Sequence, residues 1–330
     1  MQNTAFMDSP IGRLTLCSDG AGLTAIRFDG DGPEPCPEAS FDPADPILAQ
    51  PAQGLRAYFA GDDPGPVPPL HPSGTAFQQT VWARLREIPY GRTLSYGALA
   101  AQTAPRPGRA RVSARAVGAA VGRNPLPILI PCHRVVGADG SLTGYAGGLD
   151  RKFYLLKRER GALLETPDLL LAKASPADWR GLYRNVWSHA ETARYMLWSV
   201  TTSAAEARAR LTRTLAWQQT HEAYTVYLRK TGEAIGFAGF RFVGAETAED
   251  TGVALGPAFV RKGYGTQIVR ALCTRAKALG AKTMILSARE QNAASRGLIE
   301  SLGFRRTETE PRTDERDGSA YRLIFYRRTL

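Results

Sequence analysis

Cysteine is scarce in this chain of 330 residues, and its few occurrences form no pattern. They are widely spaced without a Cys-x-x-Cys pair, at Cys17, Cys36, Cys132 and Cys273. This spacing argues against a disulfide framework and a zinc site, so we expect no bound metal. No stretch reaches the roughly 18 apolar residues of a membrane span, and the first residues lack the pattern of a secretory signal. We therefore expect a soluble, cytoplasmic protein that does not contact membranes.

Negative charge is scarce in the middle of the chain. Residues 73–163 hold 14 Arg and Lys against 4 Asp and Glu, whereas residues 1–72 hold 3 against 10 and residues 164–330 hold 25 against 17. The total of +11 is therefore the sum of +10, −7 and +8 in these segments. A concentrated basic segment is typical of proteins that bind a polyanion, although arginines on an ordinary surface give the same count.

Cap and turn signals in the basic segment predict three helices. Thr75 and Gln78 have the spacing of a capping box before an amphipathic helix that ends near residues 89–91. Ser95 precedes a second helix, YGALAAQ, and Ser113 precedes a third, ARAVGAAVG, with the irregular APRPGRARV between them. The last two predict a helix-turn-helix. The small side chains of the third helix suit close docking of a partner and equally suit packing against another helix.

A cysteine lies between a proline and a histidine in ILIPCHRVV, residues 128–136. The apolar run 128–130 predicts a buried strand that Pro131 terminates, which would place Cys132 at a strand end, where a pocket can open. Because a thiol reacts as its thiolate and cations lower its pKa, His133 and Arg134 would make Cys132 unusually acidic. The same neighbours also occur beside inert buried cysteines, so the pair by itself does not decide between these interpretations.

Together, these segments resemble the O6-alkylguanine-DNA alkyltransferases over roughly residues 5–162. The resemblance is carried by PCHRV, by RAVGAAVGRNPLPILI before it and by GSLTGYAGGLDRK after it. It implies a small α/β subdomain over residues 1–72, then a helix-turn-helix DNA-binding and active-site subdomain over residues 73–163. It also implies an irreversible transfer to Cys132, without a cofactor, of the alkyl group of O6-alkylguanine in double-stranded DNA. O4-alkylthymine is a further candidate substrate.

The resemblance assigns catalytic roles by position. Cys132 would be the nucleophile, and His133 would act on it as a base through a water molecule. Glu159 would orient His133, which completes the arrangement of nucleophile, base and orienting group. Asn124 would hold the turn that leads into the active-site strand.

The resemblance also implies a set of DNA-binding residues. Tyr96 would help rotate the target nucleotide, Arg115 would fill the space that it leaves, and Tyr145 would contact the flipped guanine. The helix that begins at Ser113 and Ala114 would enter the minor groove. The turn before this helix looks longer than is usual in the family and carries Arg106, Arg109 and Arg111.

Residues 164–330 predict a second domain, of α+β type. A strand-like run, AIGFAGFRFVG, is followed by RKGYGT and by a helix with Ile268, Leu272 and Ala276 on one face. The N–H groups at such a helix N-terminus can bind an anion, and the same segment also fits a simple tight turn. The strand KTMILSA and the segment QNAASRGLIESLGF complete the pattern.

This half resembles the GCN5-related N-acetyltransferases over residues 166–330. Its opening segments TPDLLLAKASPADW and WSHAETARYMLW are similar to the subgroup that acts on ribosomal-protein N-termini. The resemblance implies acetyl-CoA as cofactor and an acceptor of unknown identity, either a protein N-terminus or a small amine. Backbone N–H groups would cradle the pyrophosphate along one segment, made of Lys262, Gly263, Tyr264, Gly265 and Thr266.

Individual roles follow from this second resemblance. Asn292 would contact the cofactor arm, Ser295 would give a proton to the leaving thiolate, and Glu308 would be a base. The sequence departs from the family at Val260, where glutamine or arginine is usual, and at Ile299, where other branches have tyrosine.

The sequence thus predicts a two-domain α/β chain that joins DNA dealkylation to acetyl transfer. One alternative is a protein that binds alkylated DNA without accepting the alkyl group, which the presence of Cys132 argues against. Another is a repair protein whose second half is a degenerate, non-catalytic acetyltransferase fold used for docking. Acetyl-CoA binding distinguishes the second alternative from the main prediction.

Overall fold

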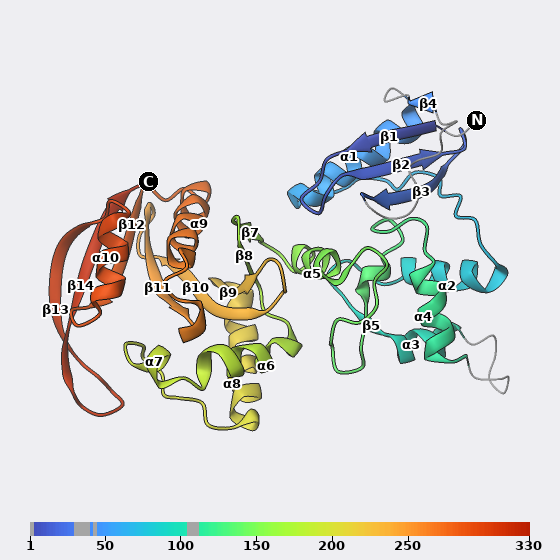
Figure 1. Cartoon of the computed structure of the whole chain (residues 1–330). Coiled ribbons are helices and arrows are strands. Elements are labelled where there is room, and N and C mark those ends of the chain that lie inside the picture. The colour runs from blue at the N-terminus through green and yellow to red at the C-terminus, as the bar shows by residue number, and fades with distance from the viewer. Residues whose placement is uncertain (1–2, 30–39, 42–44, 104–111) are drawn as a thin grey trace. The chain divides into compact units, whose positions relative to one another are not determined.

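The computed structural model describes residues 3–29, 40–41, 45–103 and 112–330 (Figure 1). It divides the chain into two compact units, Met1–Gly161 and Ala162–Leu330. The sequence places the boundary two residues later, before residue 164. Among the helices that the structure describes, none has the length and apolarity to cross a membrane.

The first unit begins with a four-stranded sheet in the order β3-β2-β1-β4. The strands are β1 (Asn3–Met7), β2 (Leu14–Ser18), β3 (Leu23–Phe28) and β4 (Ser40–Phe41). Strands β2 and β3 pair antiparallel and form a hairpin. Helix α1 (Pro46–Ala60) packs against β1 and β2 with Leu48 and Leu55 buried. Its N-terminus is capped by the Asp45 carboxylate, which accepts the Ile47 N–H at 2.8 Å.

The rest of this unit is mainly helical. Its elements are α2 (Ala76–Arg86), β5 (Leu94–Ser95), α3 (Tyr96–Thr103), α4 (Ala114–Gly122), the 3₁₀ helix η1 (Cys132–Arg134), β6 (Val135–Val136) and α5 (Leu149–Arg158). The predicted caps are present: Thr75 and Gln78 form a capping box, and the Ser95 and Ser113 hydroxyls each accept a backbone N–H at 3.1 Å. Helices α3 and α4 pack against each other, as the predicted helix-turn-helix requires. The turn predicted between them lies outside the described residues, together with Arg106, Arg109 and Arg111.

The predicted strand over residues 128–130 is wrong. This segment is a turn in which Ile128 has a φ of 74°, and Cys132 begins a short 3₁₀ helix instead of ending a strand. Three prolines within seven residues leave too few N–H donors for a strand ladder. Ile128 and Ile130 are still buried, so the apolar pattern indicated burial and not strand pairing.

The second unit is built on an eight-stranded sheet in the order β13-β14-β12-β11-β10-β9-β8-β7. The strands are β7 (Leu164–Glu165), β8 (Leu169–Ala172), β9 (Glu222–Leu228), β10 (Ala234–Phe242), β11 (Thr247–Leu255), β12 (Thr283–Arg289), β13 (Arg305–Thr313) and β14 (Ala320–Thr329). The longer helices are α8 (Ala204–Thr220), α9 (Tyr264–Ala278) and α10 (Ala293–Ser301). The shorter ones are η2 (Pro176–Asp178), α6 (Trp179–Leu182), the π-helix η3 (Tyr183–Trp187), α7 (Ala190–Ala193) and η4 (Pro257–Phe259).

Alternation along β9 shows how helices cover both faces of this sheet. Tyr224 and Val226 lie in one buried cluster with Leu272 of α9. The residue between them, Thr225, instead bonds Gln218 of α8, with 3.3 Å between Thr225 Oγ1 and Gln218 Nε2. Because successive side chains of a strand point to opposite faces, α8 and α9 cover opposite sides. The predicted apolar face of α9 is confirmed by its burial.

The middle of the sheet is open between β11 and β12. These strands pair in parallel only over 247–249 and 283–285. Beyond this point the Asp250 carboxylate accepts the Ser287 N–H at 2.9 Å in place of a ladder partner. On its other side, β11 has a bulge where it pairs with β10. The pairing register shifts between Ala238 and Phe240 of β10, and Gly252 of β11 adopts a φ of 110°. Bulges commonly re-aim side chains next to active sites, and here the bulge adjoins a cavity.

Candidate active sites of the two units

Cys132 lines a cavity of about 320 Å³ in the first unit. The other walls come from β3, from Tyr96 at the start of α3, from the end of α4 and from the loop 144–147. Cys132 itself is only 5% exposed, so a reactant must enter this cavity to meet the sulfur. The site therefore depends on segments that lie more than a hundred residues apart in the sequence.

Asn124 fastens the turn that carries Cys132. Its side-chain amide donates to the Ile130 carbonyl at 2.8 Å and lies 3.1 Å from Cys132 Sγ. Its carbonyl oxygen accepts the Leu126 N–H at 3.0 Å. Since a donor favours the charged form of the sulfur, Asn124 both shapes the turn and stabilises a thiolate. From the sequence, Asn124 was expected to hold the turn before Cys132.

The expectation that Cys132 is unusually acidic is wrong. Burial raises the pKa of the Cys132 thiol, and the hydrogen bond from Asn124 and the charge of Lys152 oppose this only in part. Arg134, which was expected to stabilise the thiolate, points instead to Glu159, with 2.8 Å between Arg134 Nε and Glu159 Oε2. The sulfur thus rests as a thiol and needs a base to become a nucleophile.

Glu159 is the centre of a buried hydrogen-bond network. It accepts from His133 Nε2 at 2.7 Å, from Arg134 at 2.8 and 2.9 Å, from the Tyr58 hydroxyl at 2.9 Å and from the Gly91 N–H at 3.1 Å. Burial alone would raise the pKa of Glu159, but the hydrogen bonds from His133 and Arg134 outweigh it and lower the pKa to about 2. Glu159 is therefore ionised at neutral pH.

His133 is held in the state of a base. Because ionised Glu159 can only accept, the His133 proton lies on Nε2 and the lone pair on Nδ1. Nδ1 is buried and has no hydrogen-bond partner among the described residues. Burial lowers the pKa of His133 although Glu159 raises it, so the ring is neutral at neutral pH. A neutral ring with a free Nδ1, next in sequence to Cys132, can take a proton from the sulfur through a water.

Lys152 belongs to this site and was missing from the residues that the sequence suggested. Its side chain is fully buried, and Nζ donates to the backbone carbonyls of Val135, Thr143 and Gly144. Burial lowers the pKa of Lys152 to about 8, whereas the nearby Cys132 raises it. Lys152 therefore ties the loop over the cavity to the active-site turn and contributes positive charge near the sulfur.

Two of the predicted DNA-binding residues line the cavity. The Tyr96 hydroxyl donates to the carbonyls of residues 143 and 144, at 3.1 Å each, and so fixes the same loop as Lys152. The Tyr145 ring is tilted against Phe28 with 6.3 Å between centroids. Both rings are therefore placed where a planar base entering the cavity would meet them.

The other predicted DNA-binding residues lie on the exposed side of α4. Ser113, Ala114 and Arg115 are exposed, whereas Val117 and Ala120 on the opposite side are buried. Within the described part of the first unit, the small residues at the start of α4 are therefore left uncovered. This favours docking of a partner over internal packing as the reason for their small size.

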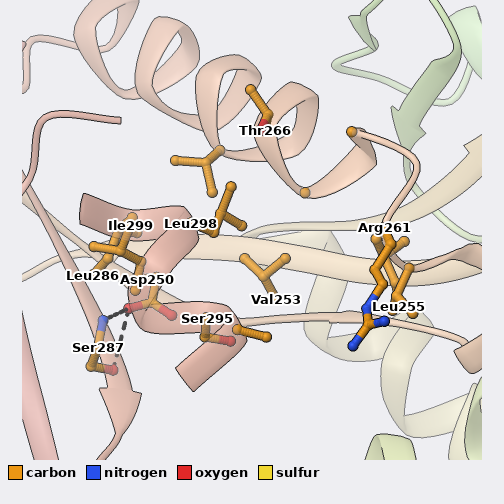
Figure 2. A pocket seen from close by; sticks show the side chains of 15 residues that line it. Asp250, Val253, Leu255, Arg261, Thr266, Leu286, Ser287, Ser295, Leu298 and Ile299 are labelled. Carbon is orange, nitrogen blue, oxygen red and sulfur yellow. Dashed lines mark hydrogen bonds between the residues drawn. The ribbon is translucent and has the colours of Figure 1, made fainter. Parts of the chain in front are cut away.

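The second unit has a cavity of about 550 Å³ where β11 and β12 separate (Figure 2). We call it the cofactor cavity. Its walls come from β11, β12, α10 and the start of α9. Of the predicted pyrophosphate segment, Gly263, Gly265 and Thr266 line it, whereas the side chains of Lys262 and Tyr264 do not.

The loop before α9 has the backbone of an anion site. Arg261 and Gly263 adopt left-handed φ values of 59° and 77°, and Gly263 caps α9 without a side-chain hydrogen bond to the first turn. N–H groups of that turn are thus left for a ligand. A polar cradle of this kind at one side of a large apolar cavity fits a pyrophosphate with a long arm.

Asp250 stands at the other side of the cofactor cavity and was not predicted from the sequence. In Figure 2, it lies with Ser287 and Ser295 on the side of the view opposite Arg261. Burial raises the pKa of Asp250 to about 7, although hydrogen bonds from Ser287 and Gly252 lower it. Asp250 can therefore exchange a proton near neutral pH, which ordinary aspartate cannot.

The remaining predicted residues of the second unit have different surroundings. Ser295 lines both the cofactor cavity and a neighbouring cavity. Asn292 lines only the neighbouring one and caps α10 by accepting the Ser295 N–H at 3.1 Å. Glu308 lines neither and is exposed on β13, 4.0 Å from Arg327. The structure therefore does not bring Glu308 together with Ser295, whereas Asp250 lines the same two cavities as Ser295.

Three family models match the chain. The ribonuclease-like domain of 6-O-methylguanine DNA methyltransferase matches residues 4–64, its DNA-binding domain matches residues 76–161, and an acetyltransferase (GNAT) domain matches residues 168–305. The methylated-DNA–protein-cysteine methyltransferase of Mycobacterium leprae is 46% identical over 158 residues, which cover 48% of this chain and 92% of that protein. The one from Methanosarcina acetivorans is 44% identical over 156 residues, covering 47% and 96%.

Solved structures also resemble each half. The O6-methylguanine methyltransferase of Mycobacterium tuberculosis has 46% identity, covers 48% of this chain and 93% of its own, and has a TM-score of 0.43. A GNAT-family acetyltransferase from Bacillus anthracis has 19% identity, covers 51% and 98%, and has a TM-score of 0.45.

The first unit, with its enclosed cysteine beside a helix-turn-helix, is a DNA repair alkyltransferase unit, and a GNAT domain follows it. The chain belongs to the methylated-DNA–protein-cysteine methyltransferase family. The predicted family, fold class and combination of domains are confirmed.

Proposed function

We propose that Cys132 accepts the alkyl group of O6-alkylguanine in double-stranded DNA. His133 Nδ1 takes the thiol proton through a water, and Glu159 stabilises the resulting imidazolium. The sulfur attacks the alkyl carbon, the carbon–oxygen bond breaks, and guanine leaves while a thioether remains on the protein. The observation that carries this proposal is the neutral, buried His133 with a free Nδ1, beside a thiol that opens only to a cavity. Because a thioether is stable, each chain reacts once.

The DNA-facing residues have distinct parts in this proposal. The exposed start of α4 enters the minor groove, where small side chains allow close approach, and Arg115 occupies the space of the extruded nucleotide. Tyr96 and Tyr145 receive the flipped base in the cavity. Extrusion costs a few kcal/mol and costs least for a poorly paired base, which favours the damaged guanine. O4-alkylthymine, as a poorly paired base, is a candidate for the same route.

Intact-mass spectrometry tests this assignment. After incubation with duplex DNA containing O6-methylguanine, the protein should gain the mass of one methyl group, and peptide mapping should place it on Cys132. Cys132→Ala should gain nothing. Cys17→Ala and Cys273→Ala are matched controls, since both residues are buried free cysteines, and should still be methylated. A methyl group on another residue would refute the assignment.

We further propose that the second unit transfers the acetyl group of acetyl-CoA to an amine. The first-turn N–H groups of α9, from Gly263 to Thr266, bind the pyrophosphate. Asp250 takes the proton that the attacking amine releases, and Ser295 gives one to the leaving thiolate. The observation that carries this proposal is the single cavity that joins an anion cradle to a carboxyl with a pKa near neutrality.

Calorimetry with acetyl-CoA separates this function from that of a non-catalytic docking module, since only the former requires binding. For an active unit, acetylation of a test amine should rise with pH as Asp250 loses its proton, with a midpoint near its pKa of about 7. Asp250→Asn should remove this step and most of the activity without preventing acetyl-CoA binding. Absence of acetyl-CoA binding would favour the docking alternative.

A further inference from the structure

Two further cavities continue from the catalytic end of the cofactor cavity. The next one, which we call the central cavity, shares Asp250 and Ser295 with the cofactor cavity. Beyond it lies a cavity of about 540 Å³ that shares Trp217 and Thr251 with the central one. We call this last one the tryptophan cavity, because Trp187, Trp198 and Trp217 contribute to its walls. The shared residues place the three cavities side by side, from the proposed acid–base groups to the tryptophan cavity.

The arginines of the central and tryptophan cavities differ in whether their charge is balanced. Three in the central cavity have carboxylate partners, in the pairs Arg241–Glu249, Arg289–Asp314 and Arg312–Glu310. The two in the tryptophan cavity, Arg210 and Arg213, form no ion pair with any residue that the structure describes. Among the described residues, the arginines of the tryptophan cavity thus lack the ion pairs that those of the central cavity have.

Arg210 is held in a fixed orientation. Its guanidinium carbon lies 4.8 Å from the centroid of the Trp187 ring and 4.1 Å from that of the Trp198 ring. One N–H donates to the Thr201 hydroxyl at 3.2 Å. Burial and the neighbouring Arg213 lower the pKa of Arg210 to about 10, so it remains charged at neutral pH. A partly buried charge without a counter-ion is costly, and an anionic ligand would relieve that cost.

The acidic residue of this cavity, Glu206, offsets the charge of Arg210 only in part, because burial and Arg213 still lower the Arg210 pKa. Glu206 accepts hydrogen bonds from the N–H and the hydroxyl of Thr202, at 2.9 and 3.3 Å, and so holds the segment just before α8. The other wall residues offer rings and small polar groups, among them Phe237 and Gln218. The cavity therefore combines two donors for an anion with flat apolar surfaces.

We propose that the tryptophan cavity binds the acetyl acceptor, and that this acceptor is an amine whose tail carries a carboxylate or phosphate beside an apolar group. The inference rests on the proposed acetyl transfer and specifies its substrate class. The anion lies on Arg210 and Arg213, and the amine reaches past Thr251 to Asp250. Its nitrogen attacks the acetyl carbonyl carbon and the carbon–sulfur bond breaks. Asp250 receives the amine proton, and Ser295 protonates the thiolate and regains its proton from solvent.

The test compares acceptors with and without an anionic tail. Phosphoserine amide is paired with serine amide, and a short peptide with acidic residues after its free N-terminus is paired with the same peptide bearing the corresponding amides. We expect the full-length protein to prefer the anionic member of at least one pair by about tenfold or more in kcat/KM, since tenfold corresponds to about 1.4 kcal/mol. The pair that shows the preference identifies a small molecule or a peptide as the source of the anion.

Variants on α8 show whether the two arginines cause the preference. Arg210→Gln and Arg213→Gln should each raise KM for the anionic acceptor and bring the preference close to unity, with little change for the neutral one. Arg208→Gln is the matched control, because Arg208 lies on the same helix but outside the cavity and stacks on Trp179. The proposal would be overturned if the wild-type protein used the anionic and neutral acceptors equally well. It would also be overturned if the preference for the anionic acceptor remained in both Arg210→Gln and Arg213→Gln.

A separate measurement keeps this inference distinct from the proposed function. Calorimetry with acetyl-CoA alone and with phosphoserine amide or the acidic peptide alone reports the two cavities independently. Without acetyl-CoA binding, acetyl transfer fails, yet binding of an anionic probe that Arg210→Gln abolishes would still support the anion site. If acetyl-CoA binds and no anionic probe depends on Arg210, the acceptor assignment fails while acetyl transfer stands.

Discussion

Replacing Glu159 by glutamine removes the charge that a set of buried donors shares. In the folded protein the pKa of Glu159 falls from its ordinary value of 4.5 to about 2, and its side chain is 1% exposed, so solvent screens it little. At about 1.36 kcal/mol for each pH unit, this fall stabilises the folded protein by about 3 kcal/mol near pH 7. Because the folded pKa is depressed, the stabilisation is fully present above 4.5 and is lost as the pH falls through about 2.

Urea unfolding followed by circular dichroism, fitted with one transition for each compact unit, measures this contribution. Glutamine resembles the protonated carboxyl, so Glu159→Gln should lose about 3 kcal/mol near pH 7 but only about 1 kcal/mol near pH 3. The transition of the second unit should not change and serves as the internal control. Two stability curves that stay parallel from pH 7 to pH 3 would refute the idea that the ionised carboxylate holds this network together.

Three further outcomes are expected. Cys132→Ala should abolish alkyl transfer and leave DNA binding and acetyl-CoA binding unchanged, because it removes only the nucleophile; electrophoretic mobility shifts and calorimetry measure the two affinities. Arg115→Ala should slow transfer from duplex DNA much more than reaction with free O6-benzylguanine, which needs no extrusion, and parallel alkylation rates measure the difference. Gly263→Asp should weaken acetyl-CoA binding in calorimetry without changing dealkylation, since it puts a negative charge beside the proposed pyrophosphate site.

Matched variants distinguish these effects from nonspecific loss of charge and from backbone strain. Arg84 is an exposed arginine on α2, and Arg84→Ala should slow neither alkylation reaction appreciably; equal losses on both substrates for Arg115→Ala would contradict its role in extrusion. Gly263 has a φ of 77°, where any side chain is strained, so Gly263→Ala reproduces the strain without the charge. If both Gly263 variants bound acetyl-CoA equally, charge would not be the cause. Loss of alkyl transfer in folded Gly263→Asp would contradict independent sites.

Local signals predicted the helices of the alkyltransferase unit well. The hydroxyls of Thr75, Ser95 and Ser113 cap helices as expected, because capping depends on neighbours within three residues. The segment at residues 128–130 was mistaken for a strand, because apolar runs report burial and the Asn124 contacts that shape the turn leave no periodic signal. The acidity of Cys132 was misjudged, since a neighbour in sequence such as Arg134 can point elsewhere.

Lys152 could have been found from the sequence, whereas Asp250 could not. Lys152 in α5 and Glu159 at its C-cap share the helical face of Leu155 and Leu156, which are buried. Charged residues on an apolar face indicate a buried network. Asp250 lies in a strand beside another acidic residue, Glu249, and nothing in that stretch distinguishes it. Burial raises its pKa, and this burial depends on the packing of the whole sheet.

The hydrogen bond between Tyr58 and Glu159 spans 101 positions in the chain. It joins α1, which covers the N-terminal sheet, to the network that orients His133, and β3 of that sheet also supplies part of the cavity wall. The portion that carries the nucleophile, residues 73–161, is therefore not a self-sufficient repair module. Excised by itself, it would keep the thiol but lose one wall of its cavity and one donor to Glu159. The smallest fragment expected to retain reactivity begins at the first strand, which makes the acidic N-terminal segment part of the catalyst.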